Sequence, residues 1–89
     1  MATTTDELVE DNLLAVFRDN ICLVRDHLGI SQVELARRAE RSASYICDVE
    51  RGRRKPNLST VAIIAHALGV SVSDLLSESL GEQLAKRAN

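Results

Sequence analysis

Glycine follows each run of apolar residues that recurs at three- and four-residue spacing in this chain of 89 residues. Such spacing places apolar side chains on one face of an α-helix. The residue just past a helix end often needs a positive φ, which glycine adopts without strain. No segment alternates with a period of two, so we expect no β-strand. The clearest stripe is Leu14, Phe17, Ile21, Val24 and Leu28, and Gly29 follows it. The other three glycines are Gly52, Gly69 and Gly81.

Residues that favour helix N-termini alternate with these glycines. They are the capping-box-like pairs Ser31 with Glu34 and Ser71 with Asp74, the single caps Ser42 and Asn57, and Pro56, whose missing N–H is harmless before a helix. Helices are expected over 8–28, 32–39, 43–51, 58–68 and 72–79, with a break or frayed turn near the acidic start of the first. The short connections predict an all-α, compact five-helix bundle.

The length suits a single folded domain with one modest core. We divide the chain into an acidic N-terminal extension (1–12), a main domain (13–80) and a polar C-terminal tail (81–89). The apolar runs are too short for a membrane span. The start of the chain has neither a basic leader nor an apolar stretch, so we expect a cytoplasmic protein with no membrane partner.

The residue types that carry metal or catalytic chemistry are sparse. Cys22, Cys47, His27 and His66 have no ligand-like spacing, so we expect no metal and no cofactor. We find no nucleophile–base pair and no glycine-rich phosphate loop, so the chain is not expected to be an enzyme. We expect a semi-buried Cys22 and a surface Cys47 in a reducing cytoplasm, and a redox switch at Cys47 is the alternative.

Charge is divided unevenly along the chain, although the net charge is only −2. Residues 1–20 hold five acidic side chains and one arginine, a local charge of −4. Residues 37–55 hold seven basic and three acidic side chains, a local charge of +4. Because phosphate responds to the local patch, this favours a nucleic-acid-binding face opposite an acidic one. With only Phe17 and Tyr45 as aromatic residues, a base-stacking platform for single strands is not expected.

Two short helical patterns joined by a tight connection lie between Gln32 and Gly52, and a basic run follows them. The motifs that carry a family resemblance are Gln32-Val-Glu-Leu35-Ala36, Ser42-Ala-Ser-Tyr45-Ile46, Val49-Glu50-Arg51-Gly52, Pro56 and a later stretch from Val61 to Leu76. From about Phe17 to Leu76 the chain resembles the phage-repressor-like (Cro/repressor, or XRE) helix-turn-helix family. The resemblance implies a five-helix DNA-binding domain, usually a homodimer on a palindromic operator. Small members include restriction–modification controllers, phage or plasmid regulators and small repressors.

The second helix of this pair is expected to enter the major groove of double-stranded DNA. Ile46 and Val49 face inward at helical spacing, which leaves an outward side. The predicted base-reading residues on that side are Ala43, Ser44, Cys47 and Asp48. Asp48 can accept a hydrogen bond from cytosine N4; alternatively it is a solvated charge or pairs with Arg51 or Arg41. So sparse a reading face also favours contacts through water and DNA shape.

The predicted phosphate-binding residues lie at both ends of the helix pair and in its turn. They are Gln32, Arg41, Arg51, Arg53 and Lys55. The resemblance supports Gln32, because a glutamine there commonly contacts phosphate in the family. Solvated faces are the expectation for Arg37, Arg38 and Arg54, and Glu50 is expected to anchor the fold through an arginine of the first helix, such as Arg25.

The turn between the two short helices departs from the family pattern. The family usually has a glycine followed by a small apolar residue there, and this chain has Glu40 and Arg41. A left-handed conformation at Glu40 would cost about 1 kcal/mol unless the turn is altered. Arg41 is hard to bury, so it is expected to reach toward phosphate or pair with an acid.

Apolar residues near the C-terminus are left over once a core has been assigned. We expect a homodimer interface made by Val70, Val72, Leu76, Leu80 and Leu84, although they would otherwise simply close the bundle. In the acidic extension, apolar residues at helical spacing either lengthen the first helix or form an arm that binds a protein partner. The leading hypothesis is a sequence-specific, homodimeric transcriptional regulator. The alternative is a protein-interaction module such as an antitoxin or anti-regulator.

Overall fold

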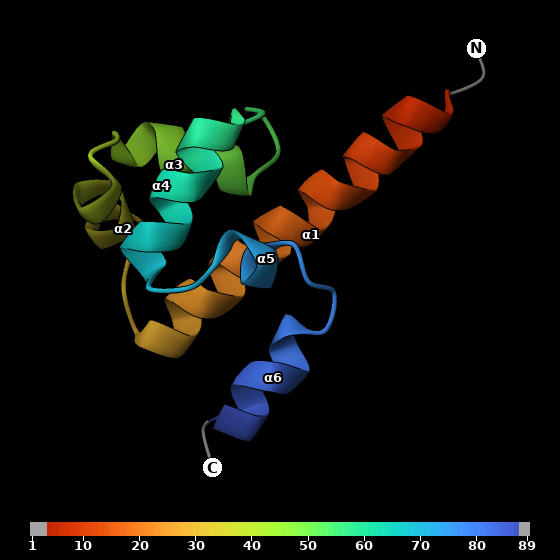
Figure 1. Cartoon of the computed structure of the whole chain (residues 1–89). Coiled ribbons are helices and arrows are strands. Elements are labelled where there is room, and N and C mark those ends of the chain that lie inside the picture. The colour runs from red at the N-terminus through yellow and green to blue at the C-terminus, as the bar shows by residue number, and fades with distance from the viewer. Residues whose placement is uncertain (1–3, 88–89) are drawn as a thin grey trace.

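A computed structural model describes residues 4–87, all of whose regular structure is helical. Figure 1 shows the helices of this part of the chain: α1 (Thr5–Leu28), α2 (Gln32–Ala39), α3 (Ala43–Glu50), α4 (Leu58–Leu68), α5 (Val72–Leu75) and α6 (Leu80–Arg87). The prediction of an all-α fold is confirmed. None of these helices combines the length and apolar character needed to cross a bilayer, within the part of the chain that is described.

One hydrophobic core joins these helices. Long α1 runs diagonally through the molecule, with α2, α3 and α4 grouped on one side of it and α6 on the other (Figure 1). The helix α2 packs on α3 and α4, while α1 contacts α3, α5 and α6. The largest fully buried side chains come from every helix: Phe17, Ile21 and Val24 of α1, Leu35 of α2, Ile46 and Val49 of α3, Ile64 of α4, Leu75 of α5 and Leu80 of α6.

The predicted starts of the second to fifth helices are confirmed, whereas the first helix starts at Thr5 and not at residue 8. At the starts of α2, α3, α4 and α5 the capping side chain accepts a hydrogen bond from the backbone N–H three residues later; the caps are Ser31, Ser42, Asn57 and Ser71. Ser71 and Asp74 form a complete capping box. Each cap satisfies a donor that the helix itself leaves free.

The predicted last helix, 72–79, is wrong, and the described residues form six helices instead of five. Buried Asn20 explains the interruption: its Nδ2 donates to the carbonyls of Leu75 at 2.9 Å and Ser77 at 2.8 Å. A side chain from α1 thus takes up carbonyls that a longer α5 would use internally. The chain turns there and starts α6, so Gly81 lies inside a helix and does not follow one.

The predicted exposed C-terminal strip is wrong for two of its residues. Leu80 and Leu84 of α6 are buried in the core of their own chain, because α6 folds back against α1. Val70, Val72 and Leu76 are partly buried against the same core. The structure therefore favours the alternative that this strip closes the bundle. The expected tail 81–89 is helical through residue 87, and residues 88–89 lie outside the described part.

The predicted break near the start of the first helix is also wrong. α1 is continuous from Thr5, and the Thr4 side chain caps it by accepting from the Glu7 N–H at 3.2 Å. Residues 5–12 of the acidic extension are thus part of the same helix as the core residues of α1, while residues 1–3 lie outside the described part. Residues 5–13, here called the α1 arm, are all exposed and project beyond the bundle (Figure 1).

Candidate nucleic-acid interface

The turn between α2 and α3 keeps a left-handed residue without glycine. Glu40 has φ 54° and ψ 43°, the one positive φ at a non-glycine residue in the described chain. The next N–H, that of Arg41, donates to the Ala36 carbonyl at 2.9 Å, so the end of α2 is closed by the usual backbone bonds. The departure from the family pattern leaves the turn unaltered, and Glu40 bears the expected conformational cost of about 1 kcal/mol.

A buried carboxylate fixes the far end of α3. Glu50 accepts from Arg25 Nε at 2.8 Å and from the side-chain amide of Gln32, and its side chain is only 4% exposed. Arg25 also donates to the Ile30 carbonyl at 3.0 Å. The expected anchoring of Glu50 by Arg25 is confirmed. This network connects α1, the start of α2 and the end of α3, so it restrains the two short helices relative to α1.

The same network controls a neighbouring thiol and an arginine. The hydrogen bond to Glu50 raises the pKa of the Arg25 guanidinium, which stays charged. Burial, and then the negative charge of Glu50, raise the pKa of the Cys22 thiol. Cys22 is therefore less reactive than an ordinary cysteine, because the thiolate is the nucleophilic form.

The predicted reading face of α3 is only partly exposed. Ser44 is exposed, while Cys47 and Asp48 are half-buried and Ala43 packs partly against the core. Ile46 and Val49 point inward and are buried, as expected. Asp48 forms no ion pair among the described side chains, so the alternative pairing with Arg51 or Arg41 is not seen.

The predicted phosphate-binding residues fall into two groups. Arg51 and Arg53 are exposed, at the end of α3 and in the loop after it. The others are engaged within the chain. Gln32 donates to Glu50, Arg41 donates to the Glu40 carbonyl at 3.1 Å, and Lys55 Nζ lies 2.8 Å from Glu10 Oε1 on the α1 arm. Glu10, followed by the nearby carboxylates of the arm, raises the pKa of Lys55.

Three arginine contacts within the chain were not predicted from the sequence. Glu34 binds both Arg37 at 2.6 Å and Arg38 at 2.9 Å on the outer side of α2. The hydrogen bonds from Arg37 and then Arg38 lower the pKa of Glu34 to about 2. The spacings of three residues from Glu34 to Arg37 and of four residues from Glu34 to Arg38 could have predicted both ion pairs. The Arg54 guanidinium lies 5.5 Å from the centre of the Tyr45 ring. No regular spacing in the sequence predicts this contact.

The part of the chain that the structure describes contains no cluster of three or more side chains able to hold a metal ion. The chemistry on this face is that of one exposed side chain of α3, Ser44, beside the exposed arginines that follow the helix. The exposed hydroxyl of Ser44 can donate or accept a hydrogen bond, and the exposed guanidinium groups of Arg51 and Arg53 can bind anionic oxygens.

The helix-turn-helix family model matches residues 23–75, which is more than half of the chain and includes α2, α3 and α4. The chain belongs to the helix-turn-helix family. The crystal structure of the hypothetical transcription factor NHTF from Neisseria has a TM-score of 0.75 and 39% sequence identity, covering 86% of this chain and 87% of that one. The clp gene regulator ClgR from Corynebacterium glutamicum has a TM-score of 0.68 and 28% identity, covering 86% of this chain and 94% of that one.

Similar curated proteins include the immunity repressor protein of Bacillus phage phi105. It is 44% identical over 55 residues, which are 62% of this chain and 38% of the repressor. The control protein C.BamHI of Bacillus amyloliquefaciens is 34% identical over 67 residues, 74% of this chain and 83% of that protein. The chain thus spans well under half of the phage repressor and most of C.BamHI.

Proposed function

We propose that this protein is a sequence-specific DNA-binding transcriptional regulator that acts as a homodimer on a palindromic operator. The observation that carries the proposal is the exposed Ser44 on α3, with exposed Arg51 and Arg53 following on the same chain segment. A helix in the major groove needs outward side chains for bases and cations beside it for phosphate. The Arg25–Glu50 contact holds α3 firmly in place for such docking.

The comparisons support the regulatory role. The relatives are named as a repressor, a control protein, a transcription factor and a gene regulator, and none of these names is that of an enzyme. A regulator that binds as a dimer also responds to its own concentration, since operator occupancy by a dimer rises steeply with the amount of protein.

Base reading and phosphate binding are assigned to different residues. Ser44, Cys47 and Asp48 lie on the outward side of α3 and would meet base edges, with Ala43 contributing at most part of its methyl group. Arg51 and Arg53 would bind the backbone directly. Gln32, Arg41 and Lys55 would first have to leave their present partners.

Selection of bound sequences from a random duplex pool, at stated salt, tests the proposal. We expect an enriched site with two inverted half-sites, because two copies related by a two-fold axis read inverted sequences. Arg53→Ala should weaken binding to every sequence and reduce the salt dependence by about one phosphate contact. Ser44→Ala should instead change the preferred sequence.

Failure of the wild-type chain to enrich any sequence would contradict specific reading. If Ser44→Ala weakened binding to selected and random DNA equally, Ser44 would not read bases. That result would not contradict the binding of α3 in the major groove. Lys86→Ala is the matched control for Arg53→Ala, because it removes one exposed positive charge from α6, far along the chain from α3. It should leave both the affinity and the salt dependence nearly unchanged.

A further inference from the structure

The Arg18 guanidinium, which projects from α1, lies against the backbone of the loop after α3. Gly52 of that loop has φ 78°, and a Cβ placed on it would lie 2.8 Å from Arg18 Nη1 and 3.1 Å from Arg18 Cζ. Atoms that are not bonded to each other pack best at about 3.5 Å or more. A side chain at position 52 would therefore displace the guanidinium, and glycine leaves the space that it fills.

Three arginines gather around Gly52. Arg51 and Arg53 are its neighbours in sequence, so the Cα atom of each lies about 3.8 Å from that of Gly52. Both are exposed, and Arg18 is half-buried beside them. Positive charges gathered in one region repel one another, and an anion bound among them relieves this repulsion. The loop and α1 together thus offer a site suited to a phosphate group.

Arg18 has no acidic partner in the part of the chain that the structure describes. The cations in the ion pairs of that part are Arg25, Arg37, Arg38 and Lys55. Arg18 also donates no hydrogen bond to a described side chain or carbonyl. A guanidinium carries five N–H donors and can bind two oxygens of one phosphate group in parallel. In contrast to Lys55, which contacts Glu10, Arg18 therefore need not leave an acidic partner before it binds an anion.

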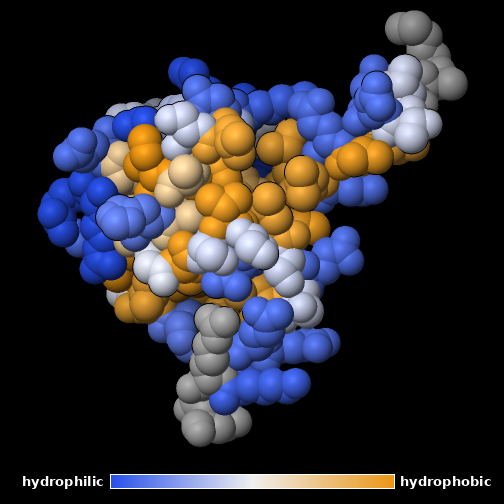
Figure 2. Space-filling model, in the orientation of Figure 1, coloured by the Kyte–Doolittle hydropathy of each residue, from blue (hydrophilic) through white to orange (hydrophobic). Residues whose placement is uncertain are grey.

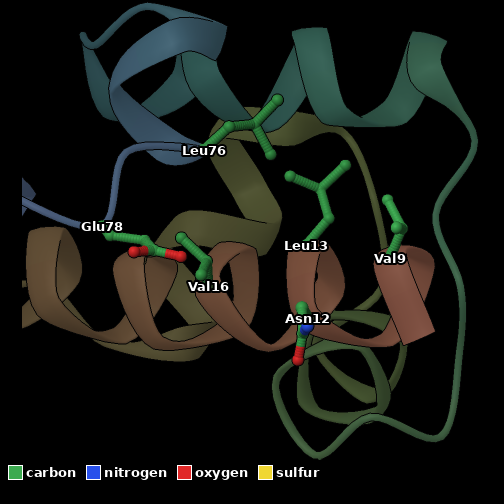
Figure 3. Close-up of a pocket in the computed structure, with 6 residues that line it drawn as sticks. All are labelled: Val9, Asn12, Leu13, Val16, Leu76 and Glu78. Carbon is green, nitrogen blue, oxygen red and sulfur yellow. The ribbon is translucent and has the colours of Figure 1, made fainter.

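The side of α1 that carries Arg18 differs from the side that faces the segment after α5. Figure 3 shows Leu13 of α1 and Leu76 pointing toward one another, with Val9 and Val16 on the same side of α1. Val9 and Leu13 are exposed, and Figure 2 shows apolar surface that extends onto the α1 arm. Arg18 follows Val9 by nine residues, or about two and a half helical turns, so it points to the opposite side of α1. α1 thus has an apolar side toward the segment after α5 and a cation toward the loop after α3.

We propose that Arg18 is a further phosphate-binding residue of the DNA interface and binds the DNA backbone beside Arg51 and Arg53. This inference rests on the proposed function, because it adds a contact to the same interface. Arg18 precedes residues 23–75, which match the family model, so the assignment depends on the packing at Gly52. Phosphate contacts fix the orientation of a protein on the duplex. A contact from α1, which packs into the core, adds a fixed point outside the helix pair.

Binding of the full chain to a labelled duplex of random sequence, measured by fluorescence anisotropy across a salt series, tests this contact. Arg18→Gln removes the charge; because Arg18 is partly exposed the variant should fold, which a thermal melt by circular dichroism checks. We expect binding about threefold to tenfold weaker at low salt and a salt dependence reduced by about one phosphate contact. Arg18→Lys keeps the charge and should keep the salt dependence. Lys86→Gln is the matched control, since it removes an exposed charge from α6, and it should change neither quantity.

Gly52→Ala and Gly69→Ala separate the seating of Arg18 from backbone strain. The two glycines have similar φ values of 78° and 73°, but a Cβ at Gly69 would meet no atom of another part of the chain within 4 Å. Both variants should lower the melting temperature by a similar amount, because a side chain is strained at positive φ. Only Gly52→Ala displaces Arg18, so it alone should weaken binding to the duplex. It should have little further effect when Arg18→Gln is already present.

Wild-type affinity and salt dependence in Arg18→Gln would overturn the proposal. If Arg18→Gln failed to fold, equal binding by Gly52→Ala and Gly69→Ala would overturn it instead. Selection from the random duplex pool distinguishes this failure from that of the proposed function. Enrichment of inverted half-sites, with Arg18→Gln unaffected, removes only the Arg18 contact. Equal wild-type binding to all sequences, with a reduced salt dependence in Arg18→Gln, supports the contact and removes sequence-specific regulation. A wild-type chain that binds no duplex at all overturns both.

Discussion

Arg25 Nε donates to Glu50 Oε1 at 2.8 Å, and this contact joins the C-terminal half of α1 to the last residue of α3. Arg25→Ala would leave the buried Glu50 carboxylate with only Gln32 as a side-chain partner. Removing one partner of a buried ion pair costs about 3 kcal/mol or more. We expect the free energy of unfolding to fall by about that much, as measured by urea denaturation at neutral pH.

The double variant Arg25→Ala, Glu50→Ala serves as the control for this prediction. Removing both charges avoids a buried, unpaired carboxylate, so the double variant should be more stable than the sum of the single changes implies. A loss below about 1 kcal/mol in Arg25→Ala would class the pair with ordinary surface ion pairs and would contradict an anchoring role.

Much of the fold follows from local sequence signals. The cap residues Ser31, Ser42 and Asn57 and the stop at Gly29 each act within one helical turn, so their effect can be predicted from neighbours in sequence. The break between α5 and α6 was not predictable in this way. It depends on Asn20, which lies 55 positions before the Leu75 carbonyl that it binds.

In the candidate site too, the features set by local geometry could be predicted from the sequence, and those set by tertiary contacts could not. Facing directions on α3 follow from helical geometry, and buried Ile46 and Val49 agree with them. Which cations are free depends on tertiary contacts. The pairing of Lys55 with Glu10 spans 45 positions and arises only because the α1 arm passes the loop after α3. No periodicity in the sequence indicates that contact.

Glu40→Gly should stabilise the protein. Glu40 has φ 54°, where a side chain costs about 1 kcal/mol or more and glycine has no such cost. The extra freedom of glycine in the unfolded chain offsets part of the gain. We expect an increase of about 0.5 kcal/mol in the free energy of unfolding, measured by urea denaturation. Glu40→Ala is the control, since it keeps the Cβ; an equal gain there would locate the effect in the charge instead of the backbone.

Glu10→Gln should raise DNA affinity if Lys55 binds phosphate. The 2.8 Å contact with Glu10 competes for the Lys55 ammonium, but exposed ion pairs of this kind are weak. We therefore expect about a twofold to fivefold gain at low salt, measured by fluorescence anisotropy, and its disappearance at high salt. Glu82→Gln on α6 is the control, because it changes the net charge equally. The gain should vanish when Lys55 is also replaced by alanine, and persistence there would mean that Glu10 acts only through long-range repulsion.

Cys47 should be protected from alkylation when DNA is bound. Cys47 lies on the outward side of α3, so DNA in contact with that side would block reagents from its sulfur. Labelling with iodoacetamide, followed by mass spectrometry of the peptides, should show at least a tenfold slower rate for Cys47 with selected DNA. Cys22 is the internal control: burial raises the pKa of its thiol, so it should react slowly with or without DNA. Equal labelling of Cys47 in the free and bound protein would place another side of α3 against the bases.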